Sequence, residues 1–112
     1  MKKSDEVIIR KINGYCSNIL EFTKNYNYSD FSADEKTCYS TSFALLQIGE
    51  LAHKLSPEFK GEYDYVNWRS IIGLRHRIVH DYDGVQISRV WDIVNENIPV
   101  LFKYACDILE DC

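Results

Sequence analysis

Two arginines, two histidines and a tyrosine fall within the eight residues of the run RHRIVHDY, residues 75–82. An arginine is permanently charged and binds anionic oxygens in a bidentate way, whereas a histidine titrates near neutral pH and therefore moves protons. Arg75 and His80 thus have the side chains for proton transfer beside a bound anion. Spacing alone does not establish catalysis, because an arginine and a histidine five residues apart are common on helices.

The charge around this run differs from that of the rest of the chain. Residues 67–80 contain three arginines, two histidines and no acid, whereas the other residues carry all 17 carboxylates. The net charge of −4 argues against a protein that coats nucleic acid by bulk electrostatics, since such binding needs many phosphate contacts. One locally positive segment therefore lies on an otherwise acidic molecule.

On an ideal helix at about 100° per residue, Arg69, Gly73, His76 and His80 fall within roughly 60° of one another and form a polar ridge. Arg75 lies about 140° from His80 around the same helix. The two side chains converge only if the helix ends or bends near residue 79, or if a second chain completes the site.

A metal site is the alternative use of the two histidines. His76 and His80 are four residues apart, but a zinc site needs a third and usually a fourth ligand, and only Asp81 and Asp83 are near. We therefore expect no metal and no cofactor.

The length and composition predict one soluble domain spanning residues 1–112. A hydrophobic content of 46% supports a modest core, and the longest uncharged run has 13 residues, too short for a membrane span. With no signal segment recognisable at its start, we expect a cytoplasmic protein without a membrane association. The four cysteines match neither a redox pair nor a zinc pattern, so we expect reduced thiols, with Cys112 on a frayed end.

Amphipathic periodicity predicts four helices, at about 4–26, 32–55, 67–84 and 88–109. Ser32 with Glu35 resembles a capping box at the second helix, and Asn67 and Ser88 are expected N-caps of the third and fourth. Pro99 should kink or interrupt the last helix. Short connections between long helices favour an all-α, antiparallel up-and-down four-helix bundle, with room for an extra short helix or a kinked last one.

The apolar positions predict which side of each helix is buried. The first helix should bury one stripe, and the second should have two apolar rows and contact more than one neighbour. The stripe of the first helix is Ile8, Ile12, Tyr15, Ile19, Phe22 and Tyr26; the rows of the second are Thr41, Leu45, Ile48, Ala52 and Leu55, and Tyr39, Phe43 and Leu46. On the third helix, one side carries Trp68, Ile71, Ile72, Arg75, Val79 and Tyr82.

Glu50 shares the second row of the helix at 32–55, beside the aromatic positions. A carboxylate in that position needs a partner, and an arginine of the third helix is the expected one. We favour a structural ion pair, which supports the site, over a direct catalytic role for Glu50.

Taken together, these residues resemble the HepT group of the HEPN superfamily of small helical ribonucleases. Arg75, His80 and Tyr82 match its R-x4-H-x-Y signature, and the flanking elements match in order across roughly residues 38–105. These elements are Ile48-Gly49-Glu50 in the second helix, Trp68 before the signature, and Val90-Trp91 at the start of the last helix.

The resemblance implies a HEPN-like bundle and a metal-independent endoribonuclease toxin that works as a homodimer, with the signature helices of two subunits meeting in a cleft. In that reading Arg75 and His80 are catalytic and the substrate is RNA, whose 2′-hydroxyl attacks the adjacent phosphorus. His76, Arg77 and Arg69 are candidate phosphate contacts.

The resemblance also implies a partner and a modification. In proteins of this group the signature tyrosine, here Tyr82, receives AMP units from a cognate minimal nucleotidyltransferase of the MntA type, which serves as the antitoxin. Added negative charge and bulk beside Arg75 would block RNA.

Two other readings remain open. One is a non-catalytic nucleotide-binding or regulatory subunit that docks the nucleotidyltransferase, which the acidic surface fits at least as well as RNA. The other is a structural bundle with an accidental motif, in which Tyr82 simply packs against the third helix's apolar side.

Overall fold

The computed structural model describes the backbone of residues 1–83 and 86–112 and the side chains of residues 1–79 and 86–112. Within this part of the chain there are eight α-helices and no strand. They are α1 (Lys3–Phe22), α2 (Tyr28–Ala33), α3 (Glu35–His53), α4 (Pro57–Glu62), α5 (Trp68–Ile72), α6 (Leu74–Asp83), α7 (Ile87–Glu96) and α8 (Ile98–Leu109).

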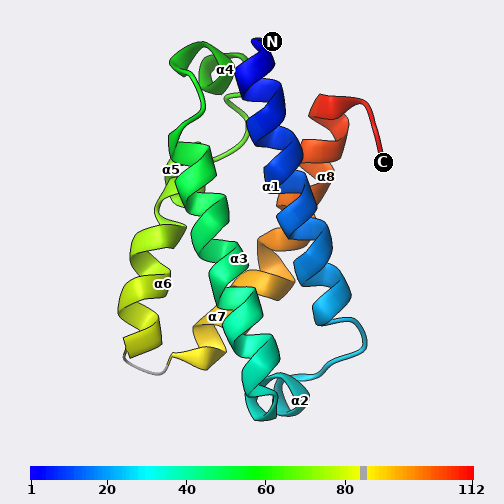
Figure 1. Ribbon diagram of the computed structural model, residues 1–112, viewed down its shortest axis with the longest axis vertical. Helices are drawn as coiled ribbons and strands as arrows, with labels where there is room; N and C mark the ends of the chain where they lie inside the picture. The colour runs from blue at the N-terminus through cyan, green and yellow to red at the C-terminus, as the bar shows by residue number, and fades with distance from the viewer. Residues whose placement is uncertain (84–85) are drawn as a thin grey trace.

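Figure 1 shows how the eight helices form the bundle. α1 descends from the N-terminus, α3 ascends beside it, α5 and α6 descend, and α7 and α8 ascend behind. α3 packs against α1, α5 and α6, and α1 also packs against α8. The predicted all-α antiparallel up-and-down arrangement is confirmed, with short α2 and α4 as additions.

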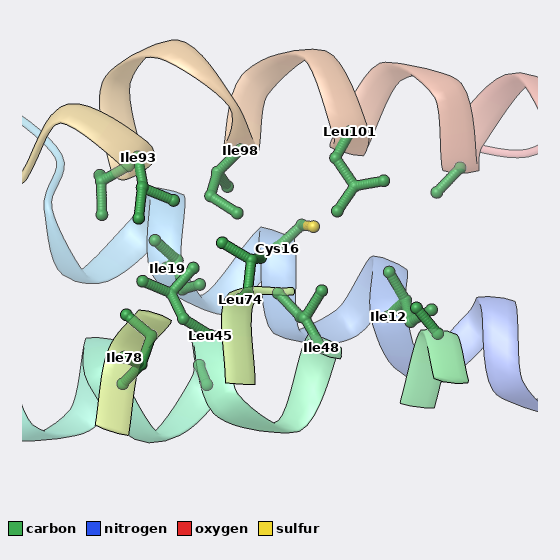
Figure 2. Packing of buried hydrophobic residues seen from close by; sticks show 14 of the residues in the cluster. Ile12, Cys16, Ile19, Leu45, Ile48, Leu74, Ile78, Ile93, Ile98 and Leu101 are labelled. Atoms are coloured by element: carbon green, nitrogen blue, oxygen red, sulfur yellow. The ribbon is translucent and has the colours of Figure 1, made fainter. Parts of the chain in front are cut away.

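The core lies where α1, α3, α6 and α8 meet, as Figure 2 shows. Ile19 of α1, Leu45 of α3, Leu74 of α6 and Ile98 of α8 contribute to one buried apolar cluster. Burying such side chains contributes roughly 1.5–3 kcal/mol each, so this cluster supplies much of the stability that holds α6 in place.

The first row predicted for α3 is buried as expected, but the second is not. The five residues from Thr41 to Leu55 in the first row are all nearly inaccessible to solvent. Tyr39 and Phe43 of the second row are 52% and 56% exposed. The neighbours of α3 within the chain therefore leave this aromatic row uncovered.

The buried stripe of α1 is rotated from the predicted one, and the helix is shorter. Ile9 and Cys16 are buried together with Ile12 and Ile19, whereas Phe22 is exposed. The helix ends at Phe22 rather than near residue 26: Thr23 leaves the helical conformation with ψ of 6°, and Asn25 adopts a left-handed conformation with φ of 64°, so the chain turns before Tyr26.

The predicted capping box at Ser32 is wrong. Asn27 and Asp30 form a capping box one helix earlier: Asp30 N donates to Asn27 Oδ1 at 2.8 Å and Asn27 N donates to Asp30 Oδ2 at 3.0 Å. The next helix, α3, is capped by Asp34, whose Oδ1 accepts from Thr37 N at 3.1 Å. Aspartate caps as well as serine does, so Ser32 was not the strongest signal nearby.

Residues 57–62 form α4 where the sequence suggested a loop. Ser56 caps this helix, with its Oγ accepting from Phe59 N at 3.1 Å, and Pro57 occupies the first helical turn, where its missing N–H has no cost. Asp5 of α1 fixes the junction, because it accepts from Ser56 N at 2.9 Å and from Ser56 Oγ at 2.6 Å.

The third predicted helix is divided at Gly73 into α5 and α6. Asn67 caps α5 as predicted, with Oδ1 accepting from Ser70 N at 3.1 Å. The break changes the phase of the buried face, so Leu74 and Ile78 are buried while Val79 is 54% exposed. The residues predicted to share one side of a single helix are therefore divided between the core and the surface.

The last predicted helix is interrupted as expected, at Asn97, two residues before Pro99. Ser88 is not its N-cap: α7 begins at Ile87, and Gln86 occupies the capping position without a side-chain hydrogen bond. The helix thus starts earlier than the serine suggested.

The prediction for the cysteines is wrong for two of the four. Cys106 and Cys112 form a disulfide that joins α8 to the C-terminal residues, whereas Cys16 and Cys38 are buried free thiols. The turn after α8, with Glu110 in a left-handed conformation, brings the two sulfurs together, which sequence spacing alone does not indicate.

Candidate functional site

Arg75 is the second residue of α6, and α3 sets its position. Its Nη1 donates to Glu50 Oε1 at 3.3 Å, and the two side chains are 36% and 42% exposed. The expected pairing of Glu50 with an arginine of this segment is therefore present. Only one guanidinium nitrogen is in this contact, so the remaining donors of Arg75 stay available to an anion.

A half-exposed pair of this kind contributes only about 0–1 kcal/mol to stability, because water screens both charges. Its main effect is geometric: one carboxylate limits the directions in which the guanidinium can point. Glu50 thus orients Arg75 from the neighbouring helix without enclosing it.

Gly49 permits the close approach of α6 to α3. A Cβ built at Gly49 would lie 2.8 Å from Arg75 N and 3.2 Å from Arg75 Cβ. Contacts with backbone atoms at 2.8 Å do not occur in folded proteins, so any larger residue would push α6 away. In the sequence Gly49 is part of the Ile48-Gly49-Glu50 stretch, and a glycine in the middle of a strong helix is the signal for this packing role.

The three residues predicted to contact phosphate do not share one face. His76 and Arg77 are exposed on α6, and Arg69 is exposed on α5, beyond the break at Gly73. The predicted continuous ridge from Arg69 to residue 80 is therefore wrong as a feature of one straight helix. Arg77 faces a pocket next to α8 rather than the side of α6 that carries the Glu50 contact.

The side chains of His80 and Tyr82 lie outside the described residues, so the roles predicted for them stay predictions. The backbone of α6 continues to Asp83, so the helix does not end at Val79. Of the arrangements that would bring Arg75 and His80 together, completion by a second chain is the one we carry forward.

The described residues carry neither a metal-binding cluster nor a membrane-spanning helix. Among the described side chains no cluster of three or more histidine, cysteine, aspartate or glutamate residues has the arrangement of a metal site. In the same part of the chain, no helix combines the length and the apolar character needed to cross a membrane.

The fold and site define a small all-α protein in which one cationic helix packs through a glycine and a carboxylate onto its neighbour. The chain belongs to the ribonuclease HepT-like family, which it matches over residues 12–108. The bundle is accordingly HEPN-like, and the family membership supports a ribonuclease.

Three relatives illustrate the similarity. A Thermococcus cleftensis protein named "Probable ribonuclease HepT" is 33% identical over 101 residues, covering 90% of this chain and 92% of that protein. A Methanocaldococcus jannaschii protein named as a "Putative RNase" is 31% identical over 87 residues, covering 78% and 80%. A third, from Caldanaerobacter subterraneus subsp. tengcongensis and also named as a "Putative RNase", is 30% identical over 95 residues, covering 85% of each.

No solved structure matches the chain significantly.

Proposed function

We propose that this protein is a metal-independent endoribonuclease toxin of a toxin–antitoxin pair. The observation that carries the proposal is Arg75, the arginine of the R-x4-H-x-Y pattern in this sequence, which α3 holds partly exposed with a single carboxylate contact. A fully enclosed arginine would be structural. This one keeps donors for a phosphate oxygen.

The proposed chemistry uses the nucleophile within RNA. His80 removes the proton of a 2′-hydroxyl, the oxygen attacks the adjacent phosphorus, and the bond to the 5′-oxygen of the next nucleotide breaks as that oxygen takes a proton from water. His80 then returns its proton to solvent. Arg75 stabilises the extra negative charge on the phosphorane oxygens. The products are a 2′,3′-cyclic phosphate and a 5′-hydroxyl, and DNA is resistant because it lacks the 2′-hydroxyl.

The supporting groups have separate tasks. Glu50 is a positioning residue that acts through Arg75. His76 and Arg69 are exposed and contribute phosphate contacts along the strand, whereas Arg77 lines the pocket next to α8.

A homodimer completes the proposed site. The exposed aromatic row of α3, with Tyr39 and Phe43, runs along the helix toward Glu50, and a groove of about 370 Å³ separates this row from α1. An uncovered aromatic face of this kind favours a protein interface. A second chain on it would bring another α6 toward Arg75, so that His80 of one subunit need not reach Arg75 of the same helix.

The proposed antitoxin is a cognate MntA-type nucleotidyltransferase that adds AMP to Tyr82. Tyr82 is seven residues after Arg75 on α6, or about two helical turns. Each added phosphate contributes negative charge close to the cations that would bind RNA.

The experiment is an RNA-cleavage assay on protein made with and without its neighbouring gene, with intact mass measured on both samples. We expect cleavage from the protein made alone. We also expect a mass increase in AMP steps at Tyr82, with loss of cleavage, in the co-expressed sample. The His80→Ala variant should be inactive and folded, with the surface variant His53→Ala as its control.

Absence of cleavage from the unmodified protein, with an unchanged mass on co-expression, would contradict the proposal. The non-catalytic regulatory subunit would then be the better description, and the acidic net charge of −4 would be read as complementary to a protein partner.

A further inference from the structure

A pocket of about 260 Å³ lies on the other side of α5 and α6 from the aromatic row of α3. Its walls come from α5, α6 and the junction of α7 with α8 at Asn97, so it spans residues on both sides of the break at Gly73 and of the break at Asn97. The proposed chemistry at Arg75 does not use it. Its volume is close to the lower end of small-ligand sites, which begin at about 300 Å³.

The pocket combines an apolar floor with a polar rim. The floor includes Ile71, Leu74, Ile98 and Leu101. The rim includes Arg77 and Glu96, which carry opposite charges. Within the described part of the chain, the side chains of these two residues form no ion pair or hydrogen bond with each other or with another residue. Their hydrogen-bonding groups are therefore open to a ligand.

This combination fits a flat heterocycle better than a free anion or an aliphatic chain. The apolar floor accepts a ring face, while a free anion would be repelled by Glu96. Guanine fits the charged pair best, because its O6 and N7 accept two hydrogen bonds from an arginine and its N1–H and N2–H₂ donate to a carboxylate. Adenine and cytosine offer a single amino donor to Glu96, and uracil has no amino donor.

The aromatic residues beside the pocket support a base rather than a peptide. Tyr104 lines the pocket and packs edge-to-face against Tyr65, with ring centroids 5.3 Å apart. Tyr65 is 56% exposed, so its ring can stack with a neighbouring base. Such stacking on exposed aromatic rings is typical of single-stranded RNA recognition.

We propose that the pocket between α5–α6 and α7–α8 binds an unpaired guanine of the RNA substrate. This inference rests on the proposed ribonuclease function and adds a base preference to it. Leu74 and Arg77 of the pocket flank Arg75 in sequence, so a strand that places a guanine here passes across the first turn of α6. Cleavage would then occur at a fixed number of nucleotides from a guanine.

The test separates binding from cleavage, because nucleoside monophosphates bind without being cut. The full chain is titrated with GMP, AMP, CMP, UMP and ribose 5-phosphate, and amide chemical shifts are followed by NMR. We expect GMP to shift Ser70, Leu74 and Leu101 and to bind at least fivefold more tightly than the other nucleotides. Ribose 5-phosphate should leave these signals unchanged.

The variant Glu96→Gln should weaken GMP binding about tenfold and remove its preference over AMP, since the amide has an NH2 donor in place of one of the two carboxylate oxygens that accept from guanine. The matched control is Asp92→Asn, which removes the same charge one turn earlier on α7 and outside the pocket. A second variant, Ser70→Phe, fills the pocket from an exposed position on α5 and should abolish the shifts while the amide spectrum stays folded.

GMP shifts that are absent from the pocket, or equal for wild type and Glu96→Gln, would overturn the inference. So would cleavage mapping that finds no guanine at a constant distance from the cut bonds. Either result is compatible with the proposed ribonuclease function if RNA is cut. Failure of the ribonuclease is recognised separately, as uncut RNA in a sample whose pocket still binds GMP.

Discussion

Two carboxylates on neighbouring helices differ in their exposure to solvent and in how fully they are hydrogen-bonded. Asp5 of α1 is 2% exposed, and both of its oxygens accept hydrogen bonds from Ser56. Glu50 of α3 is half-buried, with its side chain 42% exposed, and has one contact, 3.3 Å long, with Arg75. Because the first pair is saturated and enclosed, it can only stabilise. The second keeps unused hydrogen-bonding capacity, which a site for a charged substrate requires.

The pKa of Asp5 reflects this enclosure. Burial alone raises the pKa of the carboxyl, but the hydrogen bonds from the Ser56 hydroxyl and N–H outweigh burial and leave the pKa below its ordinary value. The ionised form is therefore the one that the fold prefers. Removing Asp5 should disturb the fold, and removing Arg75 should disturb the chemistry.

The largest expected effect is on activity at Arg75. Arg75→Ala should lower RNA cleavage by about 10²–10³-fold, the usual loss when one stabilising donor is removed from a developing oxyanion. Its melting temperature should stay close to that of wild type, because the half-exposed pair with Glu50 contributes about 0–1 kcal/mol.

The control is Arg10→Ala, which breaks an exposed pair with Glu6 on α1 and should leave cleavage unchanged. Equal loss of cleavage in Arg75→Ala and Arg10→Ala would contradict a specific role of Arg75 in the chemistry.

The second effect is on stability at Asp5. Asp5→Ala leaves the Ser56 N–H and hydroxyl without their charged acceptor and should lower the free energy of unfolding by about 1.5–3 kcal/mol, with cleavage unaffected at a temperature where the variant is folded. Urea denaturation measures the change, and Glu6→Gln, at the adjacent exposed position, should change stability by less than about 0.5 kcal/mol. A stable Asp5→Ala variant with impaired cleavage would reverse our assignment of roles.

The third effect tests the glycine that brings the two helices together. Gly49→Ala should destabilise the fold by about 1–3 kcal/mol through overpacking against the Arg75 backbone, and should also reduce cleavage by displacing α6. Gly14→Ala is the matched control, since nothing lies within 4 Å of a Cβ built there, and it should gain roughly 0.5–1 kcal/mol from helix propensity. If both substitutions stabilise the protein, the close approach at Gly49 is not a constraint.

The smallest effect is the pH dependence of the Asp5 contribution. Because the folded pKa of Asp5 is below its ordinary value, this contribution is complete above the unfolded pKa of about 3.9 and is lost as the pH falls through the folded pKa. The difference in unfolding free energy between wild type and Asp5→Asn should thus be constant near neutral pH and shrink below about pH 4. A difference that grows on acidification would mean that the pKa is raised instead.

Local signals in the sequence were sufficient for much of the fold. The cap at Asn67, the interruption before Pro99 and the buried row of α3 all follow from chemistry within one helix, and the structure confirms each of them. The error at Ser32 arose where several polar residues competed for one capping position, a choice that depends on which apolar residue is buried in the core. For α2 that apolar residue is Phe31, which is fully buried and packs against Trp91, and its burial selects the capping position. At Ser88 the reason differs, because no side chain caps α7.

Part of the candidate site could likewise be predicted, because that part also depends on the residues of a single segment. The sequence alone determined the type of its residues and the positive charge of the segment that carries Arg75, and it indicated a carboxylate partner on α3. Only the tertiary structure decided what depends on residues distant in the chain: the contact of Arg75 with Glu50 across 25 residues, the closure of Asp5 on Ser56 across 51, and the pocket between two helix breaks. Such contacts form because the helices pack at specific distances from one another, and these distances are set by the whole core rather than by any one segment.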